Sequence, residues 1–253
     1  MDKTDRPSAG RAMGAHRGGP RPVPGRVRPS GTMTRKVLLV CGILSSLLYV
    51  ATLVLAPMRW EDYSSTSQTV SELFAIGAPS RPLVVPLFLA YDVLVIATGL
   101  GVWGSAGRKR ALRVVGGLLV AYGVVGLAGP FFPIHLREIL AAGKGTLTDT
   151  MHGIITMVLV LFMLLAVGFG AAAFGKWFRL YSVATILMLV VGGVLAGLDQ
   201  PRPAANLPTP WMGVTERINI GVFLLWAVVL AVALLRAQVG RHQDNLDGRS
   251  DFG

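Results

Sequence analysis

The stretch PLFLAYDVLVIATGLGVWG, residues 86–104, is apolar along its length and carries only one charged residue, Asp92, which indicates a membrane-spanning helix. A helix of roughly 20 residues crosses a hydrocarbon core of about 30 Å and satisfies its own backbone polar groups where water is absent. The apolar runs of this length lie at residues 37–56, 83–104, 112–132, 151–173, 180–198 and 218–236. They lack the alternation typical of a β-barrel. The sequence therefore predicts an all-α, polytopic transmembrane bundle of six helices.

The composition is that of a membrane protein, with 53% hydrophobic and only 15% charged residues. A net charge of +11 would suggest nucleic-acid binding if the basic residues formed a stripe on a soluble domain. However, nine of the 24 Lys and Arg residues lie in residues 1–36, and the others are spread over loops. We therefore expect the lipid bilayer as a partner and no nucleic acid. Cys41 lies within the first apolar run, where it is typical of a small buried hydrophobe.

Three segments follow along the chain. Residues 1–36 form a basic tail rich in Pro, Gly and Arg, which we expect to be disordered because it has few large apolar side chains. Met33 directly precedes the first apolar run and is an alternative start of translation. Residues 37–236 form the transmembrane domain, and residues 237–253 form a short polar C-terminal tail.

The basic residues near the helix ends predict the orientation. One side of the predicted bundle holds Arg35, Lys36, Arg108, Lys109, Arg110, Arg113, Lys176, Arg179, Arg236 and Arg241. Loops rich in Lys and Arg stay in the cytoplasm. We therefore expect a multi-pass protein of the plasma membrane with both termini in the cytoplasm.

Asp92 lies near the middle of the second span, where a carboxylate costs about 3 kcal/mol or more unless it is protonated or partnered. It should therefore face the bundle, and Gly99 on the same helix face should let a neighbouring backbone come close. Two interpretations stay open: a residue that fixes helix packing, and an acid of a small proton- or ion-coupled transporter. Gly193 and Gly197 have the spacing of packing residues and could also serve a homo-oligomer.

Polar residues gather at the helix ends opposite the basic loops, and we call this set the outer polar layer: Ser71, Glu72, His135, Asp149, His152, Asp199, Glu216 and Arg217. Thr69 and Glu72 have the spacing of a capping box. Asp149 lies in the first turn of the fourth span, where the helix dipole favours a carboxylate. It precedes His152 by three residues, so the two would share a helix face. Two interpretations stay open: Asp149 orients the imidazole of His152, or Asp149 is a helix cap and His152 an interfacial histidine.

Arg217 lies at the apolar boundary of the last span. We expect it either to extend to the membrane interface or to pair with an acid of another helix, for which Glu72 and Asp199 are the candidates.

This layer has three possible functions. It could be structural or bind a lipid head group or small ligand, it could feed a transport path through Asp92, or it could form an intramembrane hydrolase or metalloenzyme centred on His152. Zinc needs three or four ligands, and no linear zinc spacing is present. Ser71 lacks the G-x-S-x-G and S-x-x-K contexts of known serine nucleophiles. The sequence therefore assigns no catalytic residue, metal or cofactor.

Four short motifs stand in a fixed order relative to the spans: TVSELFAIGAPSRP (69–82), GPFFPIHLRE (129–138), DTMHGIIT (149–156) and ERINIG (216–221). With them, residues 37–236 resemble the DUF998 family of bacterial and archaeal membrane proteins. The family often has an Asp where this chain has His135, so a role for that acid does not carry over. The Ser-Glu-Leu stretch is also similar, more distantly, to the Frag1/DRAM/Sfk1 proteins, which are associated with lipid and anchor handling.

The resemblance implies a six-span fold and a membrane location, and it implies no reaction. It also implies that these residues occupy recurrent family positions: Ser71, Glu72, Phe132, Pro133, His152, Glu216 and Arg217.

Overall fold

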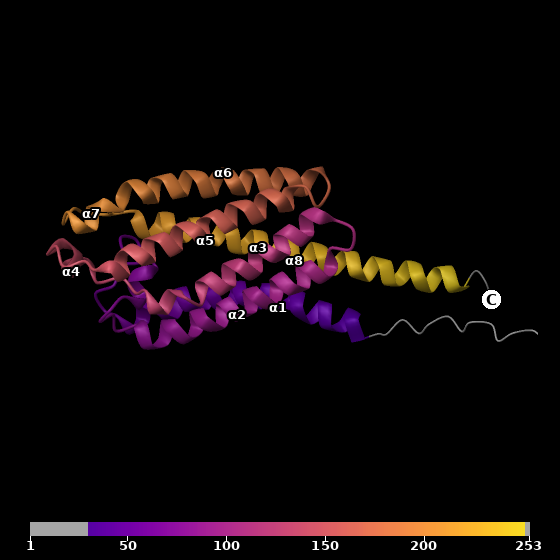
Figure 1. Cartoon of the computed structure of the whole chain (residues 1–253), viewed down its shortest axis with the longest axis horizontal. Coiled ribbons are helices and arrows are strands. Elements are labelled where there is room, and N and C mark those ends of the chain that lie inside the picture. Colours follow the sequence, from indigo (N-terminus) through magenta and orange to yellow (C-terminus); the bar gives the residue numbers. More distant parts are fainter. Residues whose placement is uncertain (1–29, 251–253) are drawn as a thin grey trace, which may run out of the picture.

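The computed structural model describes residues 30–250, with side chains described for residues 33–238. Six long helices lie side by side: α1 (Ser30–Leu55), α2 (Arg81–Ser105), α3 (Arg110–Gly126), α5 (Leu147–Ala171), α6 (Lys176–Asp199) and α8 (Met212–Ser250) (Figure 1). The connecting segments contain short helices: η1 (Pro57–Arg59), η2 (Ser71–Phe74), η3 (Gly129–Phe131), α4 (Arg137–Ala141) and α7 (Pro201–Ala204).

The structure confirms the predicted all-α bundle, since six helices are long and apolar enough to cross a membrane. These spans are Met33–Arg59, Arg81–Ser105, Arg110–Phe131, Leu147–Ala171, Lys176–Ala204 and Met212–Gln238. Residues 30–36, which the sequence placed in the tail, belong to α1, and residues 237–250 of the predicted C-terminal tail continue α8. Residues 1–29 and 251–253 of the two predicted tails lie outside the described residues.

The six long helices form a closed ring. Each packs against the next in the order α1, α2, α3, α5, α6 and α8, and α8 returns to α1. Trp226 and Phe223 of α8 are the largest fully buried side chains of the core. The ring of Phe223 contacts that of Tyr122 of α3 with centroids 5.6 Å apart, and the ring of Trp226 contacts that of Phe178 of α6 with centroids 6.2 Å apart. Aromatic contacts from α8 therefore reach across the ring to α3 and sideways to the neighbouring α6.

Glycines bring α2 and α3 into backbone contact. A Cβ atom added to Gly99 would lie 2.7 Å from the carbonyl oxygen of Gly116. One added to Gly123 would lie 2.7 Å from the carbonyl oxygen of Asp92. The predicted close approach at Gly99 is confirmed, because only a residue without a side chain fits these positions.

A polar contact inside the membrane joins α6 to α8. The Asn219 amide, oriented with its amino group toward α6, donates to the carbonyl oxygens of Met188 and Leu189 at 3.3 Å each and accepts from the Gly193 N–H at 3.2 Å. Gly193 therefore contacts α8 within the bundle. A Cβ atom added to Gly197 would have no neighbouring atom within 4 Å, and its role in a homo-oligomer stays a prediction.

The two ends of the bundle differ. The start of α1 and the end of α8 lie at the same end, together with the short α2–α3 and α5–α6 connections that carry most of the basic loop residues (Figure 1). The opposite end, which we call the outer end, is covered by the longer segments 56–80, 127–146 and 200–211. Which end faces the cytoplasm stays a prediction from the charges.

Candidate functional site

Glu72 is buried at the outer end, with 4% of its surface exposed. The N–H of Thr69 donates to Glu72 Oε1 at 3.0 Å, and the N–H of Glu72 donates to Thr69 Oγ1 at 3.3 Å. These reciprocal contacts are the predicted capping box, which opens the short helix η2. Gln68 Nε2 donates to the second carboxylate oxygen at 3.1 Å. Two of the residues that contact the Glu72 carboxylate, Gln68 and Thr69, are therefore its neighbours in sequence.

Arg137, at the start of α4, contacts the same carboxylate from a distant part of the sequence. Its Nε donates to Glu72 Oε2 at 2.9 Å and its Nη2 donates to Oε1 at 2.7 Å, so the pair is bidentate. The same guanidinium donates to the Ser67 carbonyl oxygen at 3.2 Å and to Thr209 Oγ1 at 3.4 Å. The hydrogen bond to Glu72 raises the pKa of Arg137 above its usual value. Arg137 was absent from the predicted layer, although it is the first charged residue after the GPFFP segment.

Arg217 does not pair with Glu72 or Asp199, so that prediction is wrong. Its Nη1 donates to the carbonyl oxygens of Ser65 and Gln68 at 2.9 and 3.0 Å, and its Nη2 donates to the Tyr63 hydroxyl. The physical reason is that the folded-back loop 61–70 turns its carbonyl oxygens toward α8, and a guanidinium has five donors for them. Burial raises the pKa of Tyr63 to about 12, against the opposing effect of the nearby Arg217 charge.

The first turns of α8 attach to the same loop through the backbone. The N–H of Val70 donates to Glu216 Oε2 at 2.7 Å, and the N–H of Val214 donates to the Thr66 carbonyl oxygen at 3.2 Å. Gly213 permits this approach, because an added Cβ atom would lie 2.6 Å from the Ser65 carbonyl oxygen and overlap that of Gln68. Glu216 and Arg217 thus fasten the loop to the bundle.

Asp149 caps α5 as predicted, since it accepts from the Thr146 N–H at 2.7 Å. It does not orient His152. Its carboxylate instead lies 2.9 Å from His135 Nδ1 and accepts from the His135 N–H at 2.7 Å. The segment that ends at His135 lies against the start of α5, and His135 occupies both oxygens of the Asp149 carboxylate. The interpretation that Asp149 orients His152 is therefore wrong.

His152 lies between two other segments. Its Nε2 is 3.0 Å from Ser71 Oγ, and its Nδ1 is 3.0 Å from the carbonyl oxygen of Phe132. The ring packs against Phe74 with centroids 5.7 Å apart. The structure therefore joins Ser71 of η2 to His152 of α5, a pairing that the sequence contexts of these residues did not support.

Asp199 and Asp92 lie apart from these groups. Asp199 has Arg202 as its ion-pair partner, at 3.8 Å. Asp92 is 5% exposed and faces the bundle as predicted, where an added Cβ atom on Gly126 of α3 would lie 2.6 Å from its Cγ. This close fit against a glycine supports a packing role of Asp92, and its transport role stays a prediction.

No three His, Cys, Asp or Glu side chains come together as metal ligands within the part of the chain that the structure describes. A metal at His152 would also have to displace Ser71 or the Phe132 carbonyl, which engage both ring nitrogens. The metalloenzyme alternative therefore has no ligand set among the described residues.

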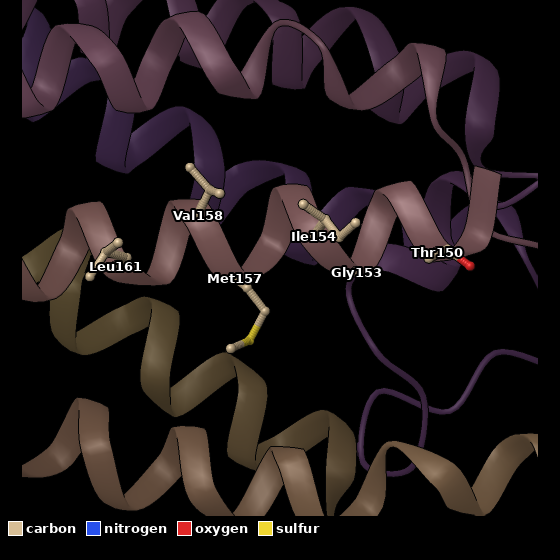
Figure 2. Close-up of a pocket in the computed structure, with 6 residues that line it drawn as sticks. All are labelled: Thr150, Gly153, Ile154, Met157, Val158 and Leu161. Carbon is tan, nitrogen blue, oxygen red and sulfur yellow. The ribbon is translucent and has the colours of Figure 1, made fainter. Parts of the chain in front are cut away.

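A shallow hollow of about 570 Å³ follows α5 and is lined by Thr150, Gly153, Ile154, Met157, Val158 and Leu161 (Figure 2). These residues share one helix face, and at 3.6 residues per turn His152 lies on the opposite face. Met157 is 71% exposed. The hollow is therefore an apolar surface of a membrane-spanning helix, separate from the Ser71–His152 pair.

A closed ring of six apolar helices with a polar layer at one end defines a polytopic integral membrane protein. A family model described as "Protein of unknown function (DUF998)" matches residues 43–233, and the chain belongs to this family. No curated protein and no solved structure matches the chain. The match includes every residue of the outer polar layer, and it supplies a membrane location without a reaction.

Proposed function

We propose that the outer end of the bundle binds the head-group region of a membrane lipid, or a small ligand of the same chemistry, at Ser71 and His152. The observation that carries this proposal is the contact between these two half-buried side chains, whose Ser71 Oγ and His152 Nε2 atoms lie 3.0 Å apart. The chain segments around them also carry exposed apolar residues: Phe131 precedes Phe132, whose carbonyl oxygen contacts His152, and Ile76 follows η2. Phe131 is 76% exposed and Ile76 is 41% exposed. A few placed polar groups bordered by apolar side chains are typical of ligand sites, and this arrangement suits a molecule with a polar head and an apolar chain.

Charged residues of the outer polar layer, together with Arg137, form the frame of this site. Glu72 and Arg137 pair with each other, and Glu216 and Arg217 bind the backbone of the loop 61–70. Because both arginines are engaged, neither offers the free fork of donors that recognises a phosphate. The proposal is therefore for an uncharged ester or hydroxyl part of the ligand.

Native mass spectrometry of the full chain, purified in a mild detergent, tests this proposal. We expect the wild type to retain lipid, and the double variant Phe131→Ser/Ile76→Ser to retain about tenfold less, because burying one large apolar side chain contributes about 1.5–3 kcal/mol. Met58→Ser is the matched control, since Met58 is 77% exposed at the outer end of α1. Equal retention in the double variant and the control, or no lipid on the wild type, would overturn the proposal.

The plasma membrane, the cytoplasmic termini and a homo-oligomer remain predictions beside this one.

A further inference from the structure

The contact between Ser71 and His152 has a defined direction. The carbonyl oxygen of Phe132 can only accept a hydrogen bond, so the proton of the neutral imidazole lies on Nδ1 and is donated at 3.0 Å. Nε2 is then an acceptor, and the Ser71 hydroxyl donates to it at 3.0 Å. The hydroxyl proton therefore already points at a base.

Both partners are held in place by groups outside the pair. Ser71 precedes Glu72, which the capping box and Arg137 fix. The His152 ring is fixed by the Phe132 carbonyl and by Phe74, whose ring lies 5.7 Å away at an angle of 51°. A nucleophile, a base within hydrogen-bond reach and a third group that orients the base are the arrangement that activates a serine.

We infer that Ser71 is the nucleophile and His152 the general base of an esterase site, with a carboxylic ester of a lipid or small acyl donor as the substrate class. This inference rests on the proposed binding of such a molecule at the pair. Ser71 Oγ attacks the ester carbonyl carbon while its proton passes to His152 Nε2. The C–O bond to the alcohol then breaks, and the alcohol leaves with that proton.

The second half of the reaction uses the same base. Water loses a proton to His152 Nε2 and attacks the acyl carbon bound to Ser71. The bond to Ser71 Oγ breaks, Ser71 recovers the proton, and the carboxylic acid is released. No oxidant, reductant or metal enters the balance.

A carboxylic ester fits this site better than a phosphate ester. The engaged arginines provide no free cation for a phosphoryl group. Phe131 and Ile76, exposed residues of the two segments that contribute Phe132 and Ser71 to the site, provide apolar surface for an acyl chain.

A fluorophosphonate probe, which phosphonylates activated serines, tests the inference on the full chain in its membranes. We expect the wild type to be labelled at Ser71, located by mass spectrometry of the peptides. Ser71→Ala should abolish this labelling, and His152→Ala should slow it at least about 100-fold, the lower range for a general base. Ser67→Ala is the matched control, because Ser67 lies in the same loop and uses its backbone oxygen, not its hydroxyl, in the frame.

The peptide map of the wild type keeps the test independent of variant folding. An unlabelled wild type, or a label on another residue, overturns the inference. If the wild type retains lipid but is not labelled, only the esterase inference fails. If Ser71 is labelled but lipid retention is the same in the Phe131→Ser/Ile76→Ser variant and the control, only the binding proposal fails.

Discussion

Among single residues, the buried acid Glu72 and its ion-pair partner contribute to the stability of the outer end. Glu72 has 6% of its side chain exposed, and Arg137 is its ion-pair partner at 2.7 Å. We predict that Arg137→Ala lowers the free energy of unfolding by about 3 kcal/mol, because it leaves a buried carboxylate without its countercharge. Thermal unfolding of the purified protein in detergent measures this change.

Arg202→Ala is the control for that measurement. Arg202 and Asp199 also form an ion pair, but their side chains are 40% and 26% exposed and 3.8 Å apart. We expect a loss below about 1 kcal/mol, as is typical of exposed pairs. Similar losses for the two arginine variants would contradict the assignment of Glu72 as a buried paired charge.

The packing role of Asp92 is also tested at single residues. Gly126→Ala places a methyl group 2.6 Å from Asp92 Cγ, and we expect it to destabilise the bundle by about 1–3 kcal/mol through overpacking. Asp92→Ala in the same chain removes the obstructing carboxyl group and should restore part of this loss. The free energies of the two single variants and the double variant form the test, and additive losses would mean that the two residues do not pack together.

At the scale of elements, the start of α8 depends on its contact with the loop 61–70. Gly213→Ala should push that loop away, because the new methyl group would lie 2.6 Å from the Ser65 carbonyl oxygen. We predict a loss of about 1–3 kcal/mol and faster proteolysis within residues 61–70.

Gly221→Ala is the matched control on the same helix, since an added Cβ atom there meets no atom within 4 Å. It should leave stability unchanged or raise it by up to about 1 kcal/mol, because alanine favours helix more than glycine does. Unchanged proteolysis in the Gly213 variant would argue against a loop held by α8.

At the scale of the whole molecule, the charge asymmetry predicts the orientation. After Cys41→Ala, a single cysteine at position 144 in the outer α4–α5 connection should react with a membrane-impermeant maleimide in intact cells. A single cysteine at position 108, in the α2–α3 connection at the opposite end, should react only after permeabilisation, because basic loops stay inside. The reverse labelling pattern would place both termini outside.

The linear sequence is sufficient to predict the six spans, the cap at Asp149 and the capping box of Thr69 and Glu72. Each of these features depends on hydrophobic length or on contacts within a few residues, so it can be seen in a linear pattern. The inward orientation of Asp92 follows equally from the cost of a carboxylate in lipid.

The contacts between polar groups of different segments depend on the three-dimensional fold. The contacting residues lie far apart in the sequence. Glu72 and Arg137 are separated by 65 residues, Ser71 and His152 by 81 residues, and Arg217 and the carbonyl of Ser65 by 152 residues. These pairings depend on how the loops 56–80 and 127–146 fold over the ring of helices, and several acceptors compete for each donor there. The predicted partners of Arg217 and His152 were wrong because a backbone carbonyl satisfies a buried donor as well as a carboxylate does, and the sequence does not mark which carbonyl will be near.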